Sequence, residues 1–358
     1  MSVIVRQRLA EWLEKNDLDA IFISKLMNVR YVSDYTSDDA YLLLTKRGQY
    51  FITDPRYTEQ ASKECLSFTI LEWRSMGSVG DAIGKIAKEE GLKRIAFEED
   101  HLTYAFYASI KHACDVELIP QRGVVEEMRS HKTPQEIDYL RASCQIASDA
   151  FEKIIKDIRV GVTEKELAAR LSYYMVALGS DTKPYGNILI SGARTSLLHG
   201  IPSAKALEFG DFVLMDYGCQ YKGYLSDMTR TVVVGRANAK QREVYRLEQE
   251  MLAAMEAEMK PGTSASHVYQ VGADIIKGTE YYQYHYTGVG HGIGMFVHEV
   301  PFLGPNHNYI LEKDTVMTAE PGIYIPGWGG VRIEDTLLIT EDGAEILTPA
   351  RKELIELV

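Results

Sequence analysis

Cysteine is scarce in this chain of 358 residues, and its four copies lie far apart in the sequence. They are Cys65, Cys114, Cys144 and Cys219. None of them forms a C-x-x-C pair, so a zinc knuckle or a thioredoxin-like motif is not expected. Free thiols without a targeting sequence are typical of a reducing compartment, so we expect a cytoplasmic protein.

Long apolar runs are also missing. The first residues read M-S-V-I-V-R-Q-R-L-A-E-W-L-E-K-N, and charges interrupt them before the apolar core of a signal peptide could form. Every apolar stretch falls short of the roughly 18–20 residues that cross a bilayer. The sequence therefore predicts no association with a membrane through a spanning helix.

Positive charge is in deficit. Lys and Arg number 39 against 51 Asp and Glu, which gives a formal net charge of -12. An acidic chain without a basic cluster has no electrostatic reason to bind nucleic acid or an anionic membrane surface. Hydrophobic residues make up 46% of the chain, and its length suffices for two ordinary domains.

Residues 1–122 alternate short apolar runs with helical patterns, and we find no catalytic constellation among them. This alternation predicts an α/β domain with a mixed or parallel sheet. We expect strands at Ala20–Ser24, Tyr41–Thr45, Tyr50–Thr53, Phe68–Leu71, Arg94–Glu98 and Val116–Ile119. We expect helices at Arg6–Lys15, Arg56–Lys63, Val79–Glu90 and Thr103–His112.

A second domain is predicted over residues 130–358, and it begins with a strong helix signal. Thr133 suits the N-cap, Pro134 the first helical position, and Glu136 completes a capping box. The same capping-box pattern occurs in Thr163-Glu164-Lys165-Glu166. It predicts the start of a second helix, which Gly179 ends. A third helical stretch runs from about residue 241 to 259. Strands lie between and after these helices, so we expect an α+β domain.

Two aspartates are predicted to converge on one face of a hairpin. The segments Gly210–Gln220 and Leu225–Val234 read as strands joined by a two-residue turn at Lys222-Gly223. If Tyr221 pairs with Tyr224, Asp216 lies across from Thr229, and Asp227 is its diagonal neighbour on the same face. Two carboxylates in apolar strands repel each other unless a cation lies between them. Two unrelated surface aspartates are the alternative.

Three further candidates lie near the C-terminal end. His291 is flanked by glycines in G-V-G-H-G-I-G, which allows backbone and ligand to approach closely. Glu320 stands in M-T-A-E-P-G-I-Y, where proline and glycine end a strand just past it. Glu334 stands in G-V-R-I-E-D-T, apparently on a strand, with Arg332 two residues before it on the same face. A loop end and an ordinary ion pair are the alternatives for these acids.

Two other histidines are weaker candidates. His298 follows His291 by seven residues in V-H-E-V-P, and His199 lies in S-L-L-H-G-I-P. A histidine before glycine in a loop is more often incidental than catalytic, and His285 is a weak candidate near the glycine loop. The others have no predicted role: they are His101, His112, His131, His267 and His307.

The five strongest candidates share one chemistry. They are Asp216, Asp227, His291, Glu320 and Glu334. Four carboxylates and one imidazole form the hard, oxygen-rich set that can hold two divalent ions. Two ions about 3.5–4 Å apart can activate one water between them. A hydrolase is therefore the first hypothesis from the residues.

Taken together, these segments resemble the pita-bread metallopeptidases, and within them the Xaa-Pro peptidases (prolidase, or Xaa-Pro dipeptidase, and aminopeptidase P). The resemblance runs from about residue 130 to the C-terminus, with the motifs in the family's order. The motifs are H-G-I-P, G-D-F-V-L-M-D-Y-G, G-Y-L-S-D-M-T-R-T, G-H-G-I-G-M-F-V-H-E-V-P, M-T-A-E-P-G-I-Y and G-V-R-I-E-D-T. The upstream domain is similar to the creatinase/prolidase N-terminal domain in pattern and length.

The resemblance implies a role for each metal ligand. Asp216 would chelate one ion, Asp227 and Glu334 would bridge both, and His291 and Glu320 would complete the ligands of the second ion. The implied reaction is hydrolysis of the bond before proline by a hydroxide that bridges the two metals. Manganese is the expected ion, with cobalt, zinc or iron as alternatives, because oxygen-rich sites discriminate weakly.

The resemblance also implies roles around the metals. Glu320 would move the proton of the bridging water, and His199 and His298 would hydrogen-bond the substrate and the tetrahedral intermediate. Independently of the resemblance, Arg332 lies two residues before Glu334 on the same face and would stand beside that carboxylate as a supporting cation. The implied substrate is a short proline-containing peptide, and a homodimer is the default expectation.

Two departures from the family pattern keep alternatives open. Leu198 precedes His199 where many members have proline. Phe302 follows Pro301 where dipeptidase-type members often carry an arginine that binds the substrate carboxylate. Longer Xaa-Pro peptides, a carboxylate partner elsewhere such as Arg332, and a hydrolase of non-peptide amides are therefore alternatives. A non-catalytic binding protein is disfavoured, since such members typically lose metal ligands.

Overall fold

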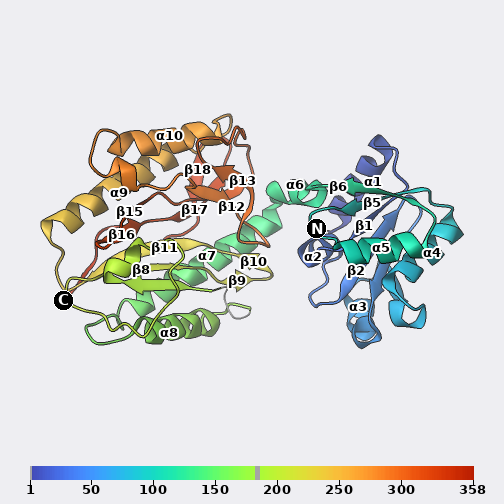
Figure 1. The fold of residues 1–358 in the computed structure, drawn as a ribbon, viewed down its shortest axis with the longest axis horizontal. Helices are drawn as coiled ribbons and strands as arrows, with labels where there is room; N and C mark the ends of the chain where they lie inside the picture. The colour runs from blue at the N-terminus through green and yellow to red at the C-terminus, as the bar shows by residue number, and fades with distance from the viewer. Residues whose placement is uncertain (1, 182–185) are drawn as a thin grey trace. The chain divides into compact units, whose positions relative to one another are not determined.

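The computed structural model describes residues 2–181 and 186–358, and they form two compact units, Met1–Arg129 and Ser130–Val358 (Figure 1). Within these described ranges, the two units share no sheet, and each has its own buried apolar residues. Among the described residues, no helix combines the length and the apolar composition that a membrane span requires. All four cysteines are buried and unbridged.

The N-terminal unit contains a six-stranded mixed sheet in the order β4-β3-β2-β1-β5-β6. Strands β1 and β2 and strands β2 and β3 pair antiparallel, whereas β5 pairs parallel with both β1 and β6. The strands are β1 Ala20–Ile23, β2 Ala40–Thr45, β3 Gln49–Thr53, β4 Thr69–Glu72, β5 Arg94–Glu98 and β6 Glu117–Gln121. The predicted α/β class and the six predicted strands are confirmed.

The helices of this unit agree less completely with the sequence patterns. They are α1 Ser2–Lys15, α2 Leu26–Ser33, α3 Thr58–Glu64, α4 Val79–Glu90, α5 Tyr104–Ala113 and α6 Val124–Ser130. Helices α2 and α6 were not predicted. Helix α2 is buried around much of its circumference, and no side chain caps its N-terminus, so neither periodicity nor a capping residue marks it.

The C-terminal unit has two pairs of long helices. They are α7 Pro134–Ile154, α8 Glu164–Ala177, α9 Ala239–Glu258 and α10 Ala265–Ile276. Both predicted capping boxes are present: Thr133 and Glu136 cap α7, and Thr163 and Glu166 cap α8. Asn238 and Gln241 form a third capping box at α9. Each box satisfies backbone N–H groups that the first helical turn cannot pair itself.

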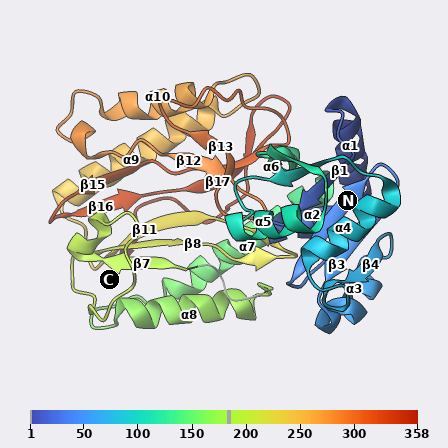
Figure 2. The same ribbon diagram turned by 45° about the vertical axis from the view of Figure 1, so that its right-hand side comes forward.

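The strands of this unit lie between the two helix pairs (Figure 2). One buried cluster packs α7 and α8 against a four-stranded sheet in the order β19-β11-β8-β7. Another packs α9 and α10 against a five-stranded sheet in the order β13-β12-β14-β17-β18 and the hairpin of β15 and β16. The predicted α+β pita-bread architecture is confirmed.

The strand bounds of the C-terminal unit follow the chain in order. They are β7 Ile188–Ser191, β8 Phe212–Tyr217, β9 Gln220–Tyr221, β10 Tyr224–Leu225, β11 Met228–Val234, β12 Gly290–Gly292, β13 Glu299–Leu303, β14 Val316–Ala319, β15 Gly322–Ile325, β16 Gly329–Arg332, β17 Asp335–Ile339, β18 Ala344–Ile346 and β19 Glu356–Leu357.

The capping box of α8 allows a test of local stability. Thr163 accepts from Glu166 N–H at 3.3 Å, and its own N–H donates to the Glu166 carboxylate at 2.9 Å. Thr163→Ala is expected to lower the free energy of unfolding by about 1 kcal/mol, because one helix donor loses its partner. Chemical denaturation measures the change. Lys165→Ala, in the same turn but outside the box, is the control, and an equal loss there would contradict the assignment.

Candidate metal centre

The hairpin that carries the two aspartates has the predicted register. Asp216 on β8 pairs with Thr229 on β11, and Tyr221 pairs with Tyr224. Lys222 and Gly223 both have positive φ, at 51° and 82°, as a two-residue turn that matches the strand twist requires. The sequence thus predicted correctly which residues face each other across this hairpin.

The predicted strands of the hairpin are interrupted, which corrects one detail. Asp227 lies just before β11 rather than within a continuous strand over Leu225–Val234. The interruption coincides with Ser226, whose hydroxyl accepts from Cys219 N–H at 3.1 Å. The N–H of Cys219 thus bonds to a side chain instead of to a backbone carbonyl of the facing strand. The regular strand pairing stops at this point, and Asp227 lies outside it.

The glycines around His291 are required by close backbone packing. A Cβ at Gly290 would collide with the carbonyl of Thr318, and one at Gly292 with the carbonyl of Val300. The His291 ring is oriented by its Nδ1, which lies 3.1 Å from the Gly292 carbonyl. A carbonyl can only accept, so Nδ1 carries the proton, and Nε2 keeps a lone pair for a metal.

Glu334 is held by Thr229 from the other side of the cluster. The Thr229 hydroxyl donates to Glu334 Oε2 at 2.6 Å, and Glu334 N–H donates to the Thr229 carbonyl at 3.1 Å. Glu334 lies between β16 and β17, not within a strand as predicted. Its Oε1 is buried without a hydrogen-bond partner among the described residues. A buried carboxylate oxygen in this condition is costly unless a cation compensates it.

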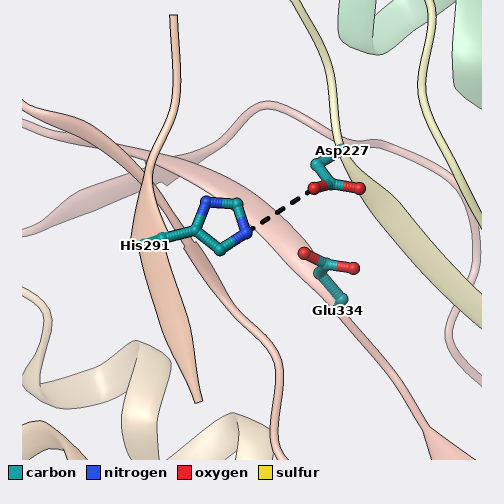
Figure 3. Close-up of side chains that lie close together, drawn as sticks. All are labelled: Asp227, His291 and Glu334. Carbon is teal, nitrogen blue, oxygen red and sulfur yellow. Dashed lines mark ion pairs between the residues drawn. The ribbon is translucent and has the colours of Figure 1, made fainter. Parts of the chain in front are cut away.

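Three of the predicted ligands form one compact cluster. Ligand atoms of Asp227, His291 and Glu334 all lie within 4.8 Å of one another, and the three side chains are buried. The imidazole points toward the two carboxylates, with His291 Nε2 3.6 Å from Asp227 Oδ2 (Figure 3). Two carboxylates and a free imidazole nitrogen at this spacing suit a divalent ion.

The other two predicted ligands border this cluster. Glu320 directly follows β14, and its Oε1 lies 3.3 Å from His291 Nε2. Asp216 accepts from Nη2 of Arg332. Both side chains are more open than the buried ligands, with 22% of Glu320 and 17% of Asp216 exposed. They therefore lie on the side of the cluster that solvent reaches.

Arg332 is engaged on all three of its nitrogens. Besides Asp216, its guanidinium donates from Nε to the Thr229 hydroxyl at 3.0 Å and from Nη1 to the Tyr324 hydroxyl at 2.7 Å. Burial of Arg332 opposes its charge, but the four neighbouring groups Tyr324, Asp216, Glu320 and Glu334 raise its pKa well above the usual value. These contacts favour a role in holding Asp216 over a role in binding a substrate carboxylate.

The charges of the cluster shift two carboxyl groups in the same direction. Burial raises the pKa of Glu334, and the charges of Asp227, Glu320 and Asp216 raise it further. Burial also raises the pKa of Glu320, while His291 and Arg332 oppose the rise. Four carboxylates thus lie close together, and His291 and Arg332 do not offset their negative charge. A bound cation would offset it.

The two histidines with predicted substrate roles differ in position. The rings of His298 and His291 meet edge to face, with centroids 4.5 Å apart. Burial lowers the pKa of His298, and the neighbouring His291 and His199 lower it further, so a neutral imidazole is favoured. His199 lies in an exposed turn after the short helix Gly192–Ser196. It is near enough to Glu320 to lower the pKa of that carboxyl group.

Two residues that contact Glu334 or Arg332 had no predicted role. Thr229 was noted only as the residue opposite Asp216, and Tyr324 only as part of a motif. The hydroxyl of Thr229 joins Glu334 to Arg332, and the hydroxyl of Tyr324 holds Arg332. The sequence signal for Thr229 is the hairpin register, which sets it opposite Asp216.

Comparison with known families agrees with this geometry. Residues 138–341 match metallopeptidase family M24, and residues 6–131 match the creatinase/prolidase N-terminal domain. The chain belongs to metallopeptidase family M24. The resemblance stated from the sequence motifs is therefore confirmed, for the upstream domain as well as for the catalytic one.

Individual M24 relatives cover nearly the whole chain. An uncharacterised peptidase of Bacillus subtilis, YqhT, is 40% identical over 94% of this chain and 96% of its own length. An Xaa-Pro dipeptidase of Pyrococcus horikoshii is 35% identical over 98% of both chains. Among solved structures, an Xaa-Pro dipeptidase from Bacillus anthracis superposes with a TM-score of 0.96, at 38% identity over 99% of this chain and 100% of its own.

A solved structure with a different named activity is almost as similar. An X-Pro aminopeptidase from Thermotoga maritima superposes with a TM-score of 0.91, at 31% identity over 98% of this chain and 99% of its own. The similarity therefore does not distinguish a dipeptidase from an aminopeptidase.

Proposed function

We propose that this M24 member is a metal-dependent exopeptidase that hydrolyses the bond before proline in short peptides. The observation that carries the proposal is the buried cluster of Asp227, His291 and Glu334, with Glu320 and Asp216 at its open side. Relatives named Xaa-Pro dipeptidase and X-Pro aminopeptidase, similar over nearly the whole chain, support the specificity for proline.

The residues present fit two divalent ions, with manganese expected and cobalt, zinc or iron as alternatives. The ligands would be Asp216, Asp227, His291, Glu320 and Glu334. The orphaned Glu334 oxygen and the crowded carboxylates support this assignment, because both call for positive charge. When bound, such ions act as Lewis acids and lower the pKa of a water to near neutrality.

The chain's own groups would bind and orient the substrate and move its protons. Glu320 is the most open carboxylate beside His291, and burial raises its pKa, so it suits the transfer of a proton at Oε1. His298, held neutral beside His291, could donate a hydrogen bond to the substrate carbonyl. His199 would serve the same purpose from its exposed turn.

Phe302 bears on the length of peptide that the site accepts. It pairs directly with His291 across β12 and β13, so both side chains project to the same face of the sheet. Phe302 is 38% exposed, and its ring packs near His307, with centroids 5.9 Å apart. An apolar ring beside the cluster offers no partner to a free carboxylate, which favours Xaa-Pro peptides longer than two residues.

A substrate panel tests the proposal. Leu-Pro, Leu-Pro-Gly and the matched Leu-Ala and Leu-Ala-Gly are offered to protein reconstituted with Mn²⁺, and release of leucine is measured. We expect cleavage of the proline peptides, with the tripeptide preferred. Equal cleavage of the alanine peptides would refute proline specificity. No cleavage of any peptide would refute the peptidase proposal and direct the search to non-peptide amides.

Phe302→Arg is expected to shift the preference toward the dipeptide. A guanidinium beside His291 could bind the carboxylate of Leu-Pro, and a charged hydrogen bond contributes about 1.5–3 kcal/mol, or about ten- to a hundredfold in kcat/KM. The ratio of kcat/KM for Leu-Pro over Leu-Pro-Gly measures the shift. Phe302→Gln, polar but uncharged, is the control, and the same ratio in wild type and Phe302→Arg would contradict the role of Phe302.

The homodimer that the resemblance implies and the cytoplasmic location expected from the free thiols both stay predictions. Light scattering during size-exclusion chromatography measures the mass in solution, and a mass near twice 40.3 kDa is the expected result.

A further inference from the structure

Arg230 has the largest fully buried side chain in the part of the chain that the structure describes. It lies on β11 next to Thr229, and alternation along a strand directs the two side chains to opposite faces. Thr229 contacts the ligand Glu334 on the metal-facing side. Arg230 therefore stands behind the candidate metal centre, where it takes no direct part in metal binding.

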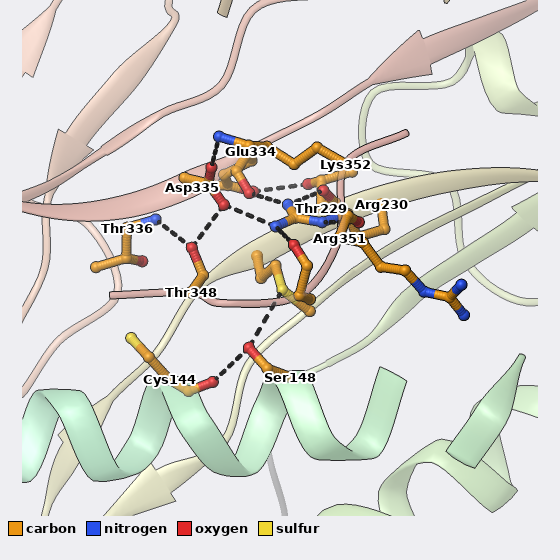
Figure 4. A network of polar contacts seen from close by, with 12 residues as sticks. Cys144, Ser148, Thr229, Arg230, Glu334, Asp335, Thr336, Thr348, Arg351 and Lys352 are labelled. Atoms are coloured by element: carbon orange, nitrogen blue, oxygen red, sulfur yellow. Dashed lines mark hydrogen bonds and ion pairs between the residues drawn. The ribbon is translucent and has the colours of Figure 1, made fainter. Parts of the chain in front are cut away.

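All five N–H groups of Arg230 have acceptors. Nη1 donates to the carbonyls of Glu334 and Thr229, at 2.5 and 2.9 Å. The other acceptors are the carbonyls of Ala350 and Arg351 and Oδ1 of Asp335. A guanidinium has five donors in a rigid planar fork, so this residue joins three segments with no donor left over (Figure 4).

The backbone of Glu334 depends on this arrangement. Glu334 lies between β16 and β17, so no strand ladder holds it. Its N–H donates to the carbonyl of Thr229, and its carbonyl accepts from Arg230. The carboxylate accepts from the hydroxyl of Thr229. Two consecutive residues of β11 thus hold the backbone and the carboxylate of one candidate ligand.

Asp335 extends the network to the C-terminal segment. It is fully buried, with Oδ1 accepting from Arg230 at 2.7 Å and from the Thr348 hydroxyl at 2.6 Å. Its Oδ2 forms an ion pair of 2.6 Å with Lys352 Nζ. Lys352 also binds Glu256 on α9, at 2.8 Å. The network thus contains two cations, Arg230 and Lys352, and two acids, Asp335 and Glu256.

The network ends at a cavity of about 220 Å³. Glu256 and Lys352 line this cavity together with Ile333, which directly precedes Glu334 in the chain. The Lys352 side chain is 30% exposed, whereas those of Arg230 and Asp335 are 1% and 0% exposed. Of Arg230, Asp335 and Lys352, only Lys352 can therefore be substituted without disturbing the buried core.

We propose that Arg230 is a positioning residue for the metal ligand Glu334, and that Asp335 and Lys352 couple this ligand to the C-terminal segment at residues 350–352. The inference rests on the proposed metal-dependent function. An ion pair with only a structural role would stabilise the fold and leave the affinity for a metal unchanged. A positioning network also sets how well Glu334 meets a metal, because outer-shell contacts orient the ligand itself.

Lys352→Met and Arg230→Lys test the proposal, with Mn²⁺ binding to the metal-stripped protein as the main readout. Lys352→Met leaves Asp335 with one cation, and Arg230→Lys replaces a five-donor fork by three donors. We expect the dissociation constant for Mn²⁺ to rise about tenfold or more in both variants, the usual range for outer-shell contacts. We also expect kcat to fall with KM nearly unchanged, and Lys352→Arg to restore both.

Arg351→Met is the matched control, because Arg351 adjoins Lys352 but pairs through its side chain with Glu152, outside the network. We expect wild-type Mn²⁺ affinity there. The melting temperature of each stripped protein separates loss of fold from loss of affinity. If Arg230→Lys does not fold, Lys352→Met decides.

Wild-type Mn²⁺ affinity in folded Lys352→Met, or an equal loss in Arg351→Met, would overturn the inference. Failure of the wild type itself to bind Mn²⁺ would instead refute the proposed function.

Discussion

Replacing Glu320 by glutamine is expected to remove nearly all turnover and to leave the fold intact. Glu320 Oε1 lies 3.3 Å from His291 Nε2, and its side chain is the most exposed among the carboxylates of Asp216, Asp227 and Glu320. It is therefore the carboxylate best placed to meet a substrate. Glutamine has nearly the same shape but cannot take up a proton, and loss of a general acid–base lowers the rate by about 10²–10⁴.

The measurement is kcat for an Xaa-Pro peptide at saturating Mn²⁺, together with the melting temperature and the number of Mn²⁺ ions bound. Glu312→Gln makes the same chemical change at an exposed acid that pairs with His131, and it should keep wild-type turnover. Turnover close to wild type in Glu320→Gln would exclude Glu320 as the group that moves the proton.

Removal of divalent metal is expected to abolish activity, and Mn²⁺ should restore it with two ions bound per chain. The physical reason is the concentration of negative charge: burial and neighbouring carboxylates raise the pKa of Glu334, and one Glu334 oxygen has no hydrogen-bond partner in the described part of the chain. A cation that binds the folded state alone also stabilises it, by about 2.7 kcal/mol at a concentration one hundred times the dissociation constant.

Chelation followed by titration with Mn²⁺ tests this expectation, with activity, bound metal and melting temperature followed together. Asp227→Asn should bind fewer ions and gain less stability from Mn²⁺, because its carboxylate lies within the cluster. Asp138→Asn, at an exposed acid that pairs with Arg141, is the control. Full activity in the stripped protein would contradict metal dependence.

Local patterns in the sequence were sufficient for much of the fold. The capping boxes at Thr133 and Thr163 mark the starts of two helices, because a cap involves only residues three apart. The hairpin register that sets Asp216 opposite Thr229 follows from one short turn. Helix α2 escaped prediction because neither a cap nor a polar face marks it, and its burial comes from the rest of the unit.

The set of candidate ligands was also visible in the sequence, because each stands in its own motif and the set has one chemistry. The distances between these side chains could not be inferred from the sequence. His291 and Glu334 are 43 positions apart in the numbering, and only the packing of β12 against the segment between β16 and β17 brings them together with Asp227. The role of Thr229 as a contact of Glu334 likewise depends on that packing.

Two arginines, Arg332 and Arg230, have contacts that local sequence patterns did not predict. Arg332 was identified as a cation near a carboxylate of its own strand, Glu334, yet its guanidinium donates to Asp216, Thr229 and Tyr324. Arg230 had no predicted role, and its five acceptors come from β11, from residues 334–335 and from residues 350–351.

Family, domain types and ligand chemistry are thus encoded in short segments of this sequence, since motifs, caps and turns act over a few residues. The contacts that orient the ligands, and the apolar surface that Phe302 presents beside His291, were decided by tertiary structure. They join segments distant in sequence, whose partners are chosen by the packing of whole sheets and helices.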